Sequence, residues 1–454
     1  MRVTGGRPLH GRLCVGGSKN ATLPILAACL LTAEPVRVTN LAEVTDTQVM
    51  LEILKGLGCD VELPLVHAAD VSGRVSPELA RKMRASLVLL GPLLARRGEV
   101  RLPRPGGDDI GTRRVEQHIG GLRRLGAVVE ETPEEFIASA DRLHGARIVL
   151  DMPTVTGTEN LMMAAVLAKG RTEILNAARE PHVQDLALFL NGLGAQVTGA
   201  GTDEIVVEGV EALHGGEHSI RPDYLEAGTY AIAVAATGGE IVLECSPSGD
   251  LNVPVIKLQQ AGVEVDVGEL EISIRRPRSS PLRAVDLTTW VHPGFPTDLQ
   301  AQYMALMTQA EGLSVISEYI FENRFQHVAE LVKMGARIES LDGRTKAVHG
   351  PSRLRGTDLE VPDIRAGAAM VIAALCAEGE SMLHHAWHVD RGYPDMVAGA
   401  AGKLWVAWMR LAWAPAEGRG RPRVRPMGGS AARSAARRRC QGRRRRASAG
   451  EPEA

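Results

Sequence analysis

The sequence of 454 residues has few aromatic residues, few cysteines and no long apolar run. Phe, Trp and Tyr make up only 3% of the chain, so Leu, Val, Ile and Ala must supply most of any core. The six cysteines form no CxxC pair, which argues against a zinc site or a redox motif and favours thiols in a reducing compartment. The longest apolar run, 87–95, is broken by Gly91 and Pro92 and is far too short to span a bilayer.

Targeting signals are also lacking. Residues 1–6 do not form the apolar segment of a signal peptide. We therefore expect a soluble, cytoplasmic protein without a membrane partner. No motif indicates a metal or an organic cofactor, and the pair Gly106-Gly107 lacks the strand and helix context of a dinucleotide fingerprint.

Charge is distributed unevenly along the chain. Twelve of the 52 Lys and Arg residues lie between residues 418 and 450, a stretch without Asp or Glu, so the rest of the chain is acidic. The segment 401–454 is rich in Ala, Gly, Pro and Arg, which predicts a divergent, disordered basic tail. One interpretation is a genuine basic tail that binds nucleic acid or an acidic partner. The other is the product of a shifted reading frame in a GC-rich gene. The composition favours the shifted frame, so nucleic-acid binding is not the favoured interpretation.

A short phrase, in most copies Leu-Gly-Ala, recurs five times and predicts a helix that ends at a glycine and is followed by a strand. Its glycines are separated by 68, 68, 68 and 73 residues, a regularity that indicates repeated structural units. They are Gly58, Gly126, Gly194, Gly262 and Gly335. A sixth copy is expected near residue 403 and is absent, so the sixth unit is incomplete.

A second phrase recurs six times, with a polar start followed by an apolar helix rich in small residues. Such helices should be buried inside the domain. Their first polar residues are Lys19, Arg84, Thr158, Glu226, Asp298 and Arg365. Helix N-termini next to cations bind anions, so these starts predict a site for a phosphorylated substrate if they converge. The alternative is that each polar residue only caps its helix.

Eight motifs show that the chain resembles the UDP-N-acetylglucosamine 1-carboxyvinyltransferases over residues 1–396. They are Gly-Gly-Ser-Lys-Asn-Ala at 16–21, Met-Arg-Ala-Ser at 83–86, Pro-Gly-Gly-Asp-Asp-Ile-Gly-Thr-Arg at 105–113, Asn-Ala-Ala-Arg-Glu-Pro at 176–181, Phe-Pro-Thr-Asp-Leu-Gln-Ala-Gln at 295–302, Phe-Glu-Asn-Arg-Phe at 321–325, Asp-Ile-Arg-Ala at 363–366 and His-Val-Asp-Arg-Gly-Tyr at 388–393.

The resemblance implies an α/β fold, the two-domain inside-out α/β barrel of repeated units with three units in each lobe. Residues 1–18 and 222–400 are expected to form lobe one. Residues 19–221 are expected to form lobe two, which carries the catalytic loop 105–115.

The resemblance also implies a reaction. The enolpyruvyl group of phosphoenolpyruvate is joined to the 3′-hydroxyl of UDP-N-acetylglucosamine and phosphate is released. This is the first committed step of peptidoglycan synthesis, on which cell shape and cell division depend. The reaction runs by addition and then elimination through a tetrahedral intermediate. It needs a base for the hydroxyl proton, an acid for the methylene carbon, and cations for a phosphate and a carboxylate.

The resemblance assigns site residues one by one. The catalytic residues are Asp298 as the base, Asp108 as the acid, Lys19 and Arg391. The residues expected to bind phosphoenolpyruvate are Lys19, Asn20, Arg113, Arg324, Asp363, Arg365 and Arg391. The residues expected to bind the sugar nucleotide are Arg84, Arg113, Arg114, Val115, Glu116, Gln117, Met152, Pro153, Thr154, Val155, Asp298 and Ile320.

The chain departs from the family pattern at three positions. Asp108 stands where the catalytic loop usually carries a cysteine, which fosfomycin alkylates, so we expect activity without a cysteine adduct and resistance to fosfomycin. Asp108 can donate a proton only in its protonated form, which repulsion from Asp109 or from a bound phosphate would favour. Arg114 replaces a usual Pro and Thr156 a usual Gly.

Two other functions stay open at this point. The altered C-terminus could leave an inactive sugar-nucleotide binder, since a lobe without its last strand would expose an edge. A transferase of the shikimate type is the other alternative, which the motifs at 16–21 and 321–325 disfavour.

Overall fold

The computed structural model describes residues 1–394 apart from residue 247. Its buried apolar side chains form two separate clusters, one within residues 21–220 and one drawn from residues 3–15 and 224–393. We keep the names lobe two for 19–221 and lobe one for 1–18 with 222–394. The predicted basic tail at 401–454 and the missing sixth copy near residue 403 lie outside the described residues.

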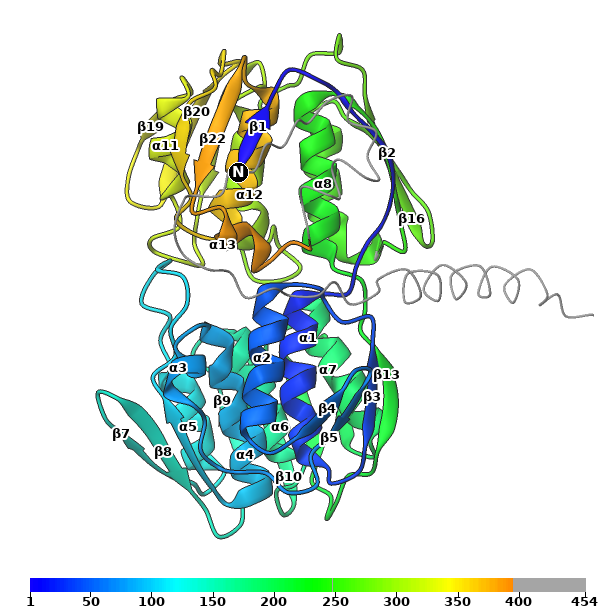
Figure 1. The fold of residues 1–454 in the computed structure, drawn as a ribbon, viewed down its shortest axis with the longest axis vertical. Coiled ribbons are helices and arrows are strands. Elements are labelled where there is room, and N and C mark those ends of the chain that lie inside the picture. Colours follow the sequence, from blue (N-terminus) through cyan, green and yellow to red (C-terminus); the bar gives the residue numbers. More distant parts are fainter. Residues whose placement is uncertain (247, 395–454) are drawn as a thin grey trace, which may run out of the picture. The chain divides into compact units, whose positions relative to one another are not determined.

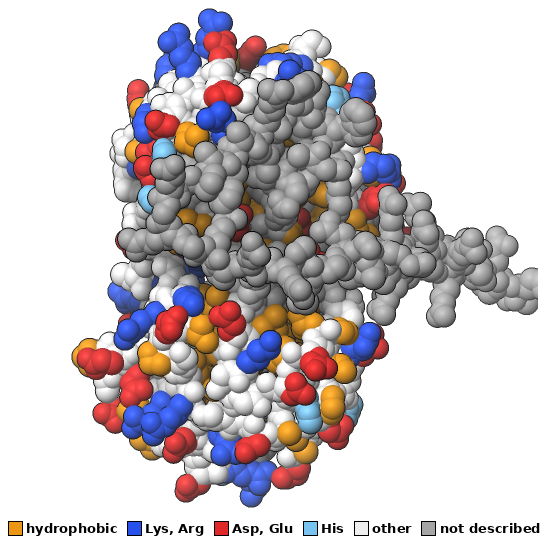
Figure 2. Space-filling model, in the orientation of Figure 1, with side chains coloured by type: hydrophobic (Ala, Val, Ile, Leu, Met, Phe, Trp, Pro, Cys, Tyr) orange, Lys and Arg blue, Asp and Glu red, His pale blue; other side chains and the backbone are white. Residues whose placement is uncertain are grey.

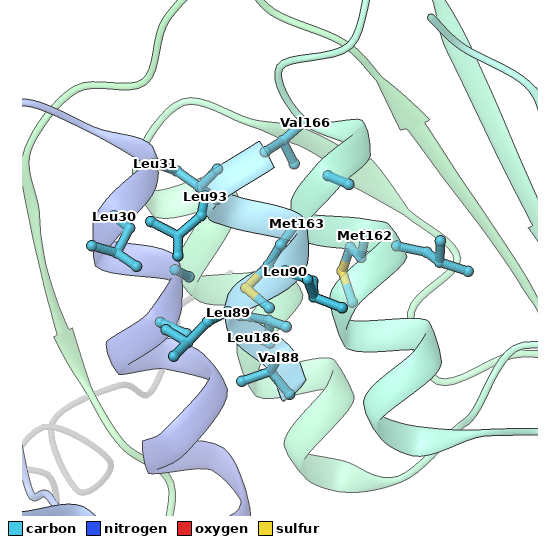
Figure 3. Close-up of a cluster of buried hydrophobic side chains, with 14 of the residues drawn as sticks. Leu30, Leu31, Val88, Leu89, Leu90, Leu93, Met162, Met163, Val166 and Leu186 are labelled. Atoms are coloured by element: carbon cyan, nitrogen blue, oxygen red, sulfur yellow. The ribbon is translucent and has the colours of Figure 1, made fainter. Parts of the chain in front are cut away.

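All six copies of the second phrase form helices, and these helices are buried. In lobe two they are α1 (Lys19–Ala28), α4 (Leu90–Arg97) and α6 (Val155–Ala165), and in lobe one α8 (Tyr224–Thr237), α10 (Gln300–Met307) and α12 (Ile364–Cys376). All 14 residues of α8 are buried. Leu30, Leu89 and Met163 come from three different helical segments and gather in the core of lobe two (Figure 3). The small residues of these helices allow this close packing.

Several helix starts differ from the predicted ones. Helix α6 begins at Val155 rather than at Thr158, because the side chain of Thr154 caps it. In the same way Asp223 caps α8, which begins at Tyr224, two residues before the predicted start at Glu226. Arg84 and Asp298 lie in short 3-10 helices, η2 (Arg84–Leu89) and η4 (Thr297–Leu299), which lead into α4 and α10.

The five glycine-terminated helices are confirmed. They are α2 (Thr45–Gly56), α5 (Glu116–Arg124), α7 (Pro181–Gly192), α9 (Asn252–Gln260) and α11 (His327–Lys333). The glycine of each phrase has a φ between 92° and 104°, a left-handed conformation that only glycine adopts readily. Strands β4 (Asp60–Glu62), β7 (Val128–Glu131), β11 (Gln196–Thr198), β15 (Glu264–Val267) and β19 (Arg337–Ser340) follow these glycines.

The described strands form six sheets, three in each lobe. Those of lobe two, in hydrogen-bonded order, are β13 (Gly216–Ser219), β3 (Val36–Thr39), β5 (Leu65–His67) and β4; β6 (Glu99–Pro103), β8 (Glu135–Ser139) and β7; and β11, β12 (Glu204–Glu208), β10 (Arg171–Leu175) and β9 (Arg147–Val149). Those of lobe one are β15, β16 (Glu271–Arg276), β14 (Gly239–Glu244) and β2 (Leu9–Cys14); β17 (Leu287–Thr288), β18 (Gly312–Ser317), β20 (Thr345–Gly350) and β19; and β1 (Arg2–Thr4), β22 (Glu380–His384) and β21 (Asp358–Glu360).

The chain passes between the lobes twice, and the two connections lie side by side. The N-terminal strands β1 and β2 pair with β22 and β14 of lobe one, far away in the sequence (Figure 1). The first connection, 15–18, then leads to α1. The second connection, 220–223, returns beside it, since the Ser18 N–H donates to the Arg221 carbonyl and the Asp223 N–H donates to the Gly16 carbonyl, both at 2.8 Å.

The sheet of the sixth unit has three strands among residues 1–394. Strand β1 pairs antiparallel with β22, and β22 pairs parallel with β21. None of the helices in this part of the chain combines the length and the apolar character that a bilayer crossing requires. Lys, Arg, Asp and Glu side chains alternate over the visible described surface of lobe two (Figure 2).

Two glycines at helix α5 test whether the left-handed glycine at the end of each repeated helix is required. We expect Gly126→Ala to lower the free energy of unfolding by about 1–2 kcal/mol, because a side chain in the left-handed region meets its own backbone. Gly120 lies inside α5 and has no atom within 4 Å of an added Cβ, so Gly120→Ala should raise it by about 0.5–1 kcal/mol. Thermal unfolding followed by circular dichroism should show midpoint shifts of opposite sign for the two variants. Shifts of the same sign would contradict the requirement for glycine at position 126.

Candidate active site

Lys19, Asp46 and Arg391 form an ion-paired cluster that joins the two lobes. Lys19 opens α1 behind the capping side chain of Ser18, and Asp46 lies in the first turn of α2. Lys19 Nζ lies 2.7 Å from Asp46 Oδ2, and Arg391 Nε lies 3.0 Å from Asp46 Oδ1. All three residues are at most 8% exposed. Charges this deeply buried interact more strongly than charges in water.

The ion pairs of the cluster keep Asp46 and Arg391 charged. Burial alone would raise the pKa of Asp46, but Lys19 and Arg391 hold it below its usual value. Burial would lower the pKa of Arg391, yet its acidic partners raise it. Asp46 and Arg391 are therefore both ionised at neutral pH.

The predicted catalytic loop 105–115 brings Asp108 to the same cluster. Arg391 Nη1 donates a hydrogen bond of 2.5 Å to Asp108 Oδ1. The loop is held on lobe one by Asn323, whose side chain donates to the Asp109 carbonyl at 3.1 Å. Segments that are 214 and 283 positions apart in the sequence thus meet at one place.

Asp298 lies between two guanidinium groups. Its Oδ1 accepts from Arg324 and its Oδ2 accepts from Arg365, each at 2.8 Å. Burial would raise the pKa of Asp298, but Arg365 and Arg324 hold it well below the usual range. Asp298 is therefore an ionised carboxylate with fixed orientation at neutral pH.

Arg113 adds a cation with no carboxylate of its own in the described contacts. Burial, then Arg84, lowers its pKa to about 10, while the charges of Asp108 and Asp298 act in the opposite direction. Arg84 also donates to the Arg113 carbonyl. Since Asp108 and Asp298 both act on Arg113, the two carboxylates and the arginines share one region, which suits an anionic ligand.

Asp363 and Asn20 lie beside these charged residues. The Asp363 side chain accepts from the N–H groups of Arg365 and Ala366 at 2.8 and 2.9 Å and so caps α12. This cap fixes the start of the helix that carries Arg365. Asn20 follows Lys19 in the first turn of α1 and is half-buried.

Two of the stretches expected to bind the sugar nucleotide lie in contact with each other. The Met152 N–H donates to Gln117 Oε1 at 3.4 Å, so the stretches 113–117 and 152–155 touch. The Thr154 side chain serves as the cap of α6. Arg114, Glu116 and Met152 are exposed, and Val115, Pro153 and Val155 are half-buried.

A buried glutamate links Ile320 to the segment that carries Asp298. Glu318 is fully buried, and its Oε1 accepts from the Ile320 N–H at 2.8 Å. Its Oε2 accepts from the Thr297 hydroxyl, also at 2.8 Å. The loop after β18 and the start of η4 are therefore tied to each other, although no predicted motif contains Glu318.

Comparison with known proteins decides the family. The family model of EPSP synthase (3-phosphoshikimate 1-carboxyvinyltransferase) matches residues 3–398. The chain belongs to the EPSP synthase family. It is therefore an enolpyruvyl (carboxyvinyl) transferase, and the expected fold class is confirmed.

Individual relatives refine this picture. A UDP-N-acetylglucosamine 1-carboxyvinyltransferase of Sorangium cellulosum is 49% identical over 402 residues, which cover 87% of this chain and 95% of the relative. The enolpyruvyl transferase NikO from Streptomyces tendae is 27% identical, with a TM-score of 0.79 over 88% of this chain and 96% of that one. An EPSP synthase of Acinetobacter baumannii shares the fold, with a TM-score of 0.68 over 88% of this chain and 96% of that one at 19% identity.

Sequence reasoning missed Asp46, as it missed Glu318. As an acid in the first turn of a helix, Asp46 has the pattern of an ordinary cap. Only the fold places it between Lys19 and Arg391, which are 372 positions apart. Within the described residues, no group of three or more His, Cys, Asp or Glu side chains is arranged to hold a metal ion.

Replacing Asp46 tests the ion-paired cluster. We expect Asp46→Asn to lower the free energy of unfolding at pH 7 by about 3 kcal/mol, because Lys19 and Arg391 stay buried without a counter-charge. Asp70 is the matched control, since it pairs with Arg97 at 3.1 Å while its side chain is 89% exposed. Asp70→Asn should cost less than about 1 kcal/mol.

The stabilisation by Asp46 should depend on pH in a definite direction. Because the folded pKa of Asp46 is lowered, its stabilisation is present above the unfolded value of about 4 and is lost as the pH falls through the folded value. In urea unfolding, the gap between wild type and Asp46→Asn should therefore narrow below about pH 4. A gap that stays constant would argue against the ionic explanation.

Proposed function

We propose that the protein transfers the enolpyruvyl group of phosphoenolpyruvate to the 3′-hydroxyl of UDP-N-acetylglucosamine and releases phosphate. The observation that carries the proposal is the meeting of two differently held carboxylates, Asp108 and Asp298, at a cluster of buried cations. The relative from Sorangium cellulosum, named for this acceptor, supports the choice of the sugar nucleotide. The reaction is the first committed step of peptidoglycan synthesis, through which it would serve cell shape and division.

The cations bind the two anionic groups of phosphoenolpyruvate. Lys19 is a compact point charge and suits the phosphate, whereas Arg391 can bind a carboxylate or phosphate through two nitrogens. Arg113 completes this group from the catalytic loop. Because Arg391 is paired with Asp46 and Asp108 before substrate binds, a phosphate that takes over one of these contacts replaces one anion by another.

Asp298 accepts the proton of the 3′-hydroxyl. The two guanidinium groups of Arg324 and Arg365 keep it ionised and aimed, which a base at neutral pH requires. They also make it a weak base, so it takes the proton only as the hydroxyl oxygen forms its bond to C2 of phosphoenolpyruvate. That order avoids a free alkoxide.

Asp108 donates the proton that C3 of phosphoenolpyruvate receives. Its Oδ1 accepts a hydrogen bond from Arg391, one of the cations proposed to bind the substrate phosphate. A substrate phosphate bound to Arg391 would lie beside Asp108. Asp108 acts as the acid in its protonated form. Removal of a proton from the resulting methyl group and loss of phosphate from C2 then complete the transfer.

The sugar nucleotide lies along lobe two and reaches lobe one at Ile320. Arg84 and the stretches 113–117 and 152–155 contact its uridine and diphosphate parts. The contact between Gln117 and Met152 supports this assignment, because it brings the two stretches together. Glu318 positions Ile320 and the start of η4 together and so connects nucleotide binding to the Asp298 segment.

The activity is tested by phosphate release from phosphoenolpyruvate by the full-length protein. We expect release with UDP-N-acetylglucosamine, and none with shikimate 3-phosphate or without an acceptor. Asp298→Asn should lower kcat by about 100-fold or more. Asp266→Asn, an exposed aspartate on β15, is the matched control and should leave kcat unchanged.

Two outcomes would contradict the proposal. Release with shikimate 3-phosphate alone would assign the shikimate-type reaction. Nucleotide binding without any release would leave an inactive sugar-nucleotide binder.

Fosfomycin distinguishes a carboxylate from a thiol at position 108. We expect the wild-type protein to keep its activity after incubation with fosfomycin and to gain no mass, because a carboxylate is a far poorer nucleophile toward the epoxide than a thiolate. Asp108→Cys should acquire a time-dependent loss of activity and a covalent adduct on the loop 105–115. Labelling of this loop in the wild-type protein would refute the assignment.

A further inference from the structure

Two cysteines outside the proposed active site lie against each other in lobe one. Cys14 ends β2, and Cys245 directly follows the parallel neighbour β14, whose Glu244 is the register partner of Cys14. The two sulfur atoms are 3.1 Å apart, and both residues are half-buried. A disulfide bond is about 2.05 Å long, so the sulfurs need to approach by only about 1 Å.

The other described cysteines are much less suited to oxidation. Cys29 is fully buried in lobe two, and burial raises its pKa well above the usual value. Burial also raises the pKa of Cys59 to about 11 and that of Cys376 to about 12. Because the thiolate is the reactive form, these three thiols should react slowly.

We propose that Cys14 and Cys245 form a reversible disulfide bond when the protein meets hydrogen peroxide. One thiolate attacks the peroxide and becomes a sulfenic acid, with release of water. The second thiol then attacks that sulfur and a second water leaves, so two thiols and one peroxide give one disulfide and two waters. A dithiol reductant reverses the reaction. Disulfides in reducing compartments are usually transient and redox-sensing in this way.

The bond joins the lobe-one end of the first connection to a segment that contacts the second connection. Cys14 is followed by the connection 15–18, which leads to Lys19. The segment after Cys245 carries Asp250, whose carboxylate pairs with Arg221 of the returning connection at 2.6 Å. A crosslink at this position restrains the lobe-one end of both connections. We expect it to lower turnover about threefold, since domain motions often limit kcat.

The bond itself is tested without any assay of activity. The full-length protein is treated with hydrogen peroxide, alkylated, digested under non-reducing conditions and analysed by mass spectrometry. We expect a peptide that links Cys14 to Cys245, with a mass about 2 Da below the sum of its two thiol peptides. Dithiothreitol should remove it. Separate alkylated peptides for both cysteines after oxidation would overturn the proposal, as would a linkage of either one to another cysteine.

Matched variants connect the bond to turnover, a readout that rests on the proposed function. Oxidised wild-type protein should lose about two thirds of its phosphate-release rate and regain it with dithiothreitol. Cys14→Ser and Cys245→Ser should keep their rate under the same treatment, whereas Cys376→Ser should respond as wild type does. If the linked peptide forms and the phosphate-release rate stays unchanged, the proposal that the bond slows turnover by restraining the connections is wrong. If no variant releases phosphate before oxidation, the proposed function fails and the peptide result still stands.

Discussion

Arg391 is the residue on which the charged arrangement of this protein depends. It comes from lobe one, but its partners are Asp46 of α2 and Asp108 of the loop 105–115, both in lobe two. Removing one partner of such a buried group leaves an uncompensated charge, which costs several kcal/mol, about 3–5 in measured cases. The lobes are therefore linked by ionic contacts that also hold the groups for which we propose chemistry.

The same contacts prepare the site for anionic substrates. Lys19 and Arg391 share one carboxylate, and Arg324 and Arg365 share another, so four cations are oriented by two aspartates. Preoriented cations do not need to reorganise when a phosphate arrives, and such preorganisation is a large part of enzymatic rate enhancement. The cost is that substrate must compete with the carboxylates already present.

Much of the fold could be predicted from the sequence, because the repeated glycines carry a local requirement. A left-handed residue at a helix end selects glycine whatever surrounds it, so Gly58 and its four counterparts marked five helix ends correctly. Helix starts were predicted less well, because Thr154 and Asp223 cap through side chains that no spacing rule identifies. The motifs named candidate site residues, but they included neither Asp46 nor Glu318. Asp46 bridges Lys19 and Arg391, and Glu318 bridges Thr297 and Ile320. In each case only the fold brings the two bridged segments together.

The central claim is that the carboxyl group of Asp108 supplies the proton in place of a thiol. The most direct test runs the reaction in D2O with UDP-N-acetylglucosamine and follows deuterium in the enolpyruvyl methylene group by mass spectrometry. We expect incorporation by the wild-type protein, and its loss in Asp108→Asn while nucleotide binding is retained. Unchanged incorporation and turnover in Asp108→Asn would show that the proton comes from another group.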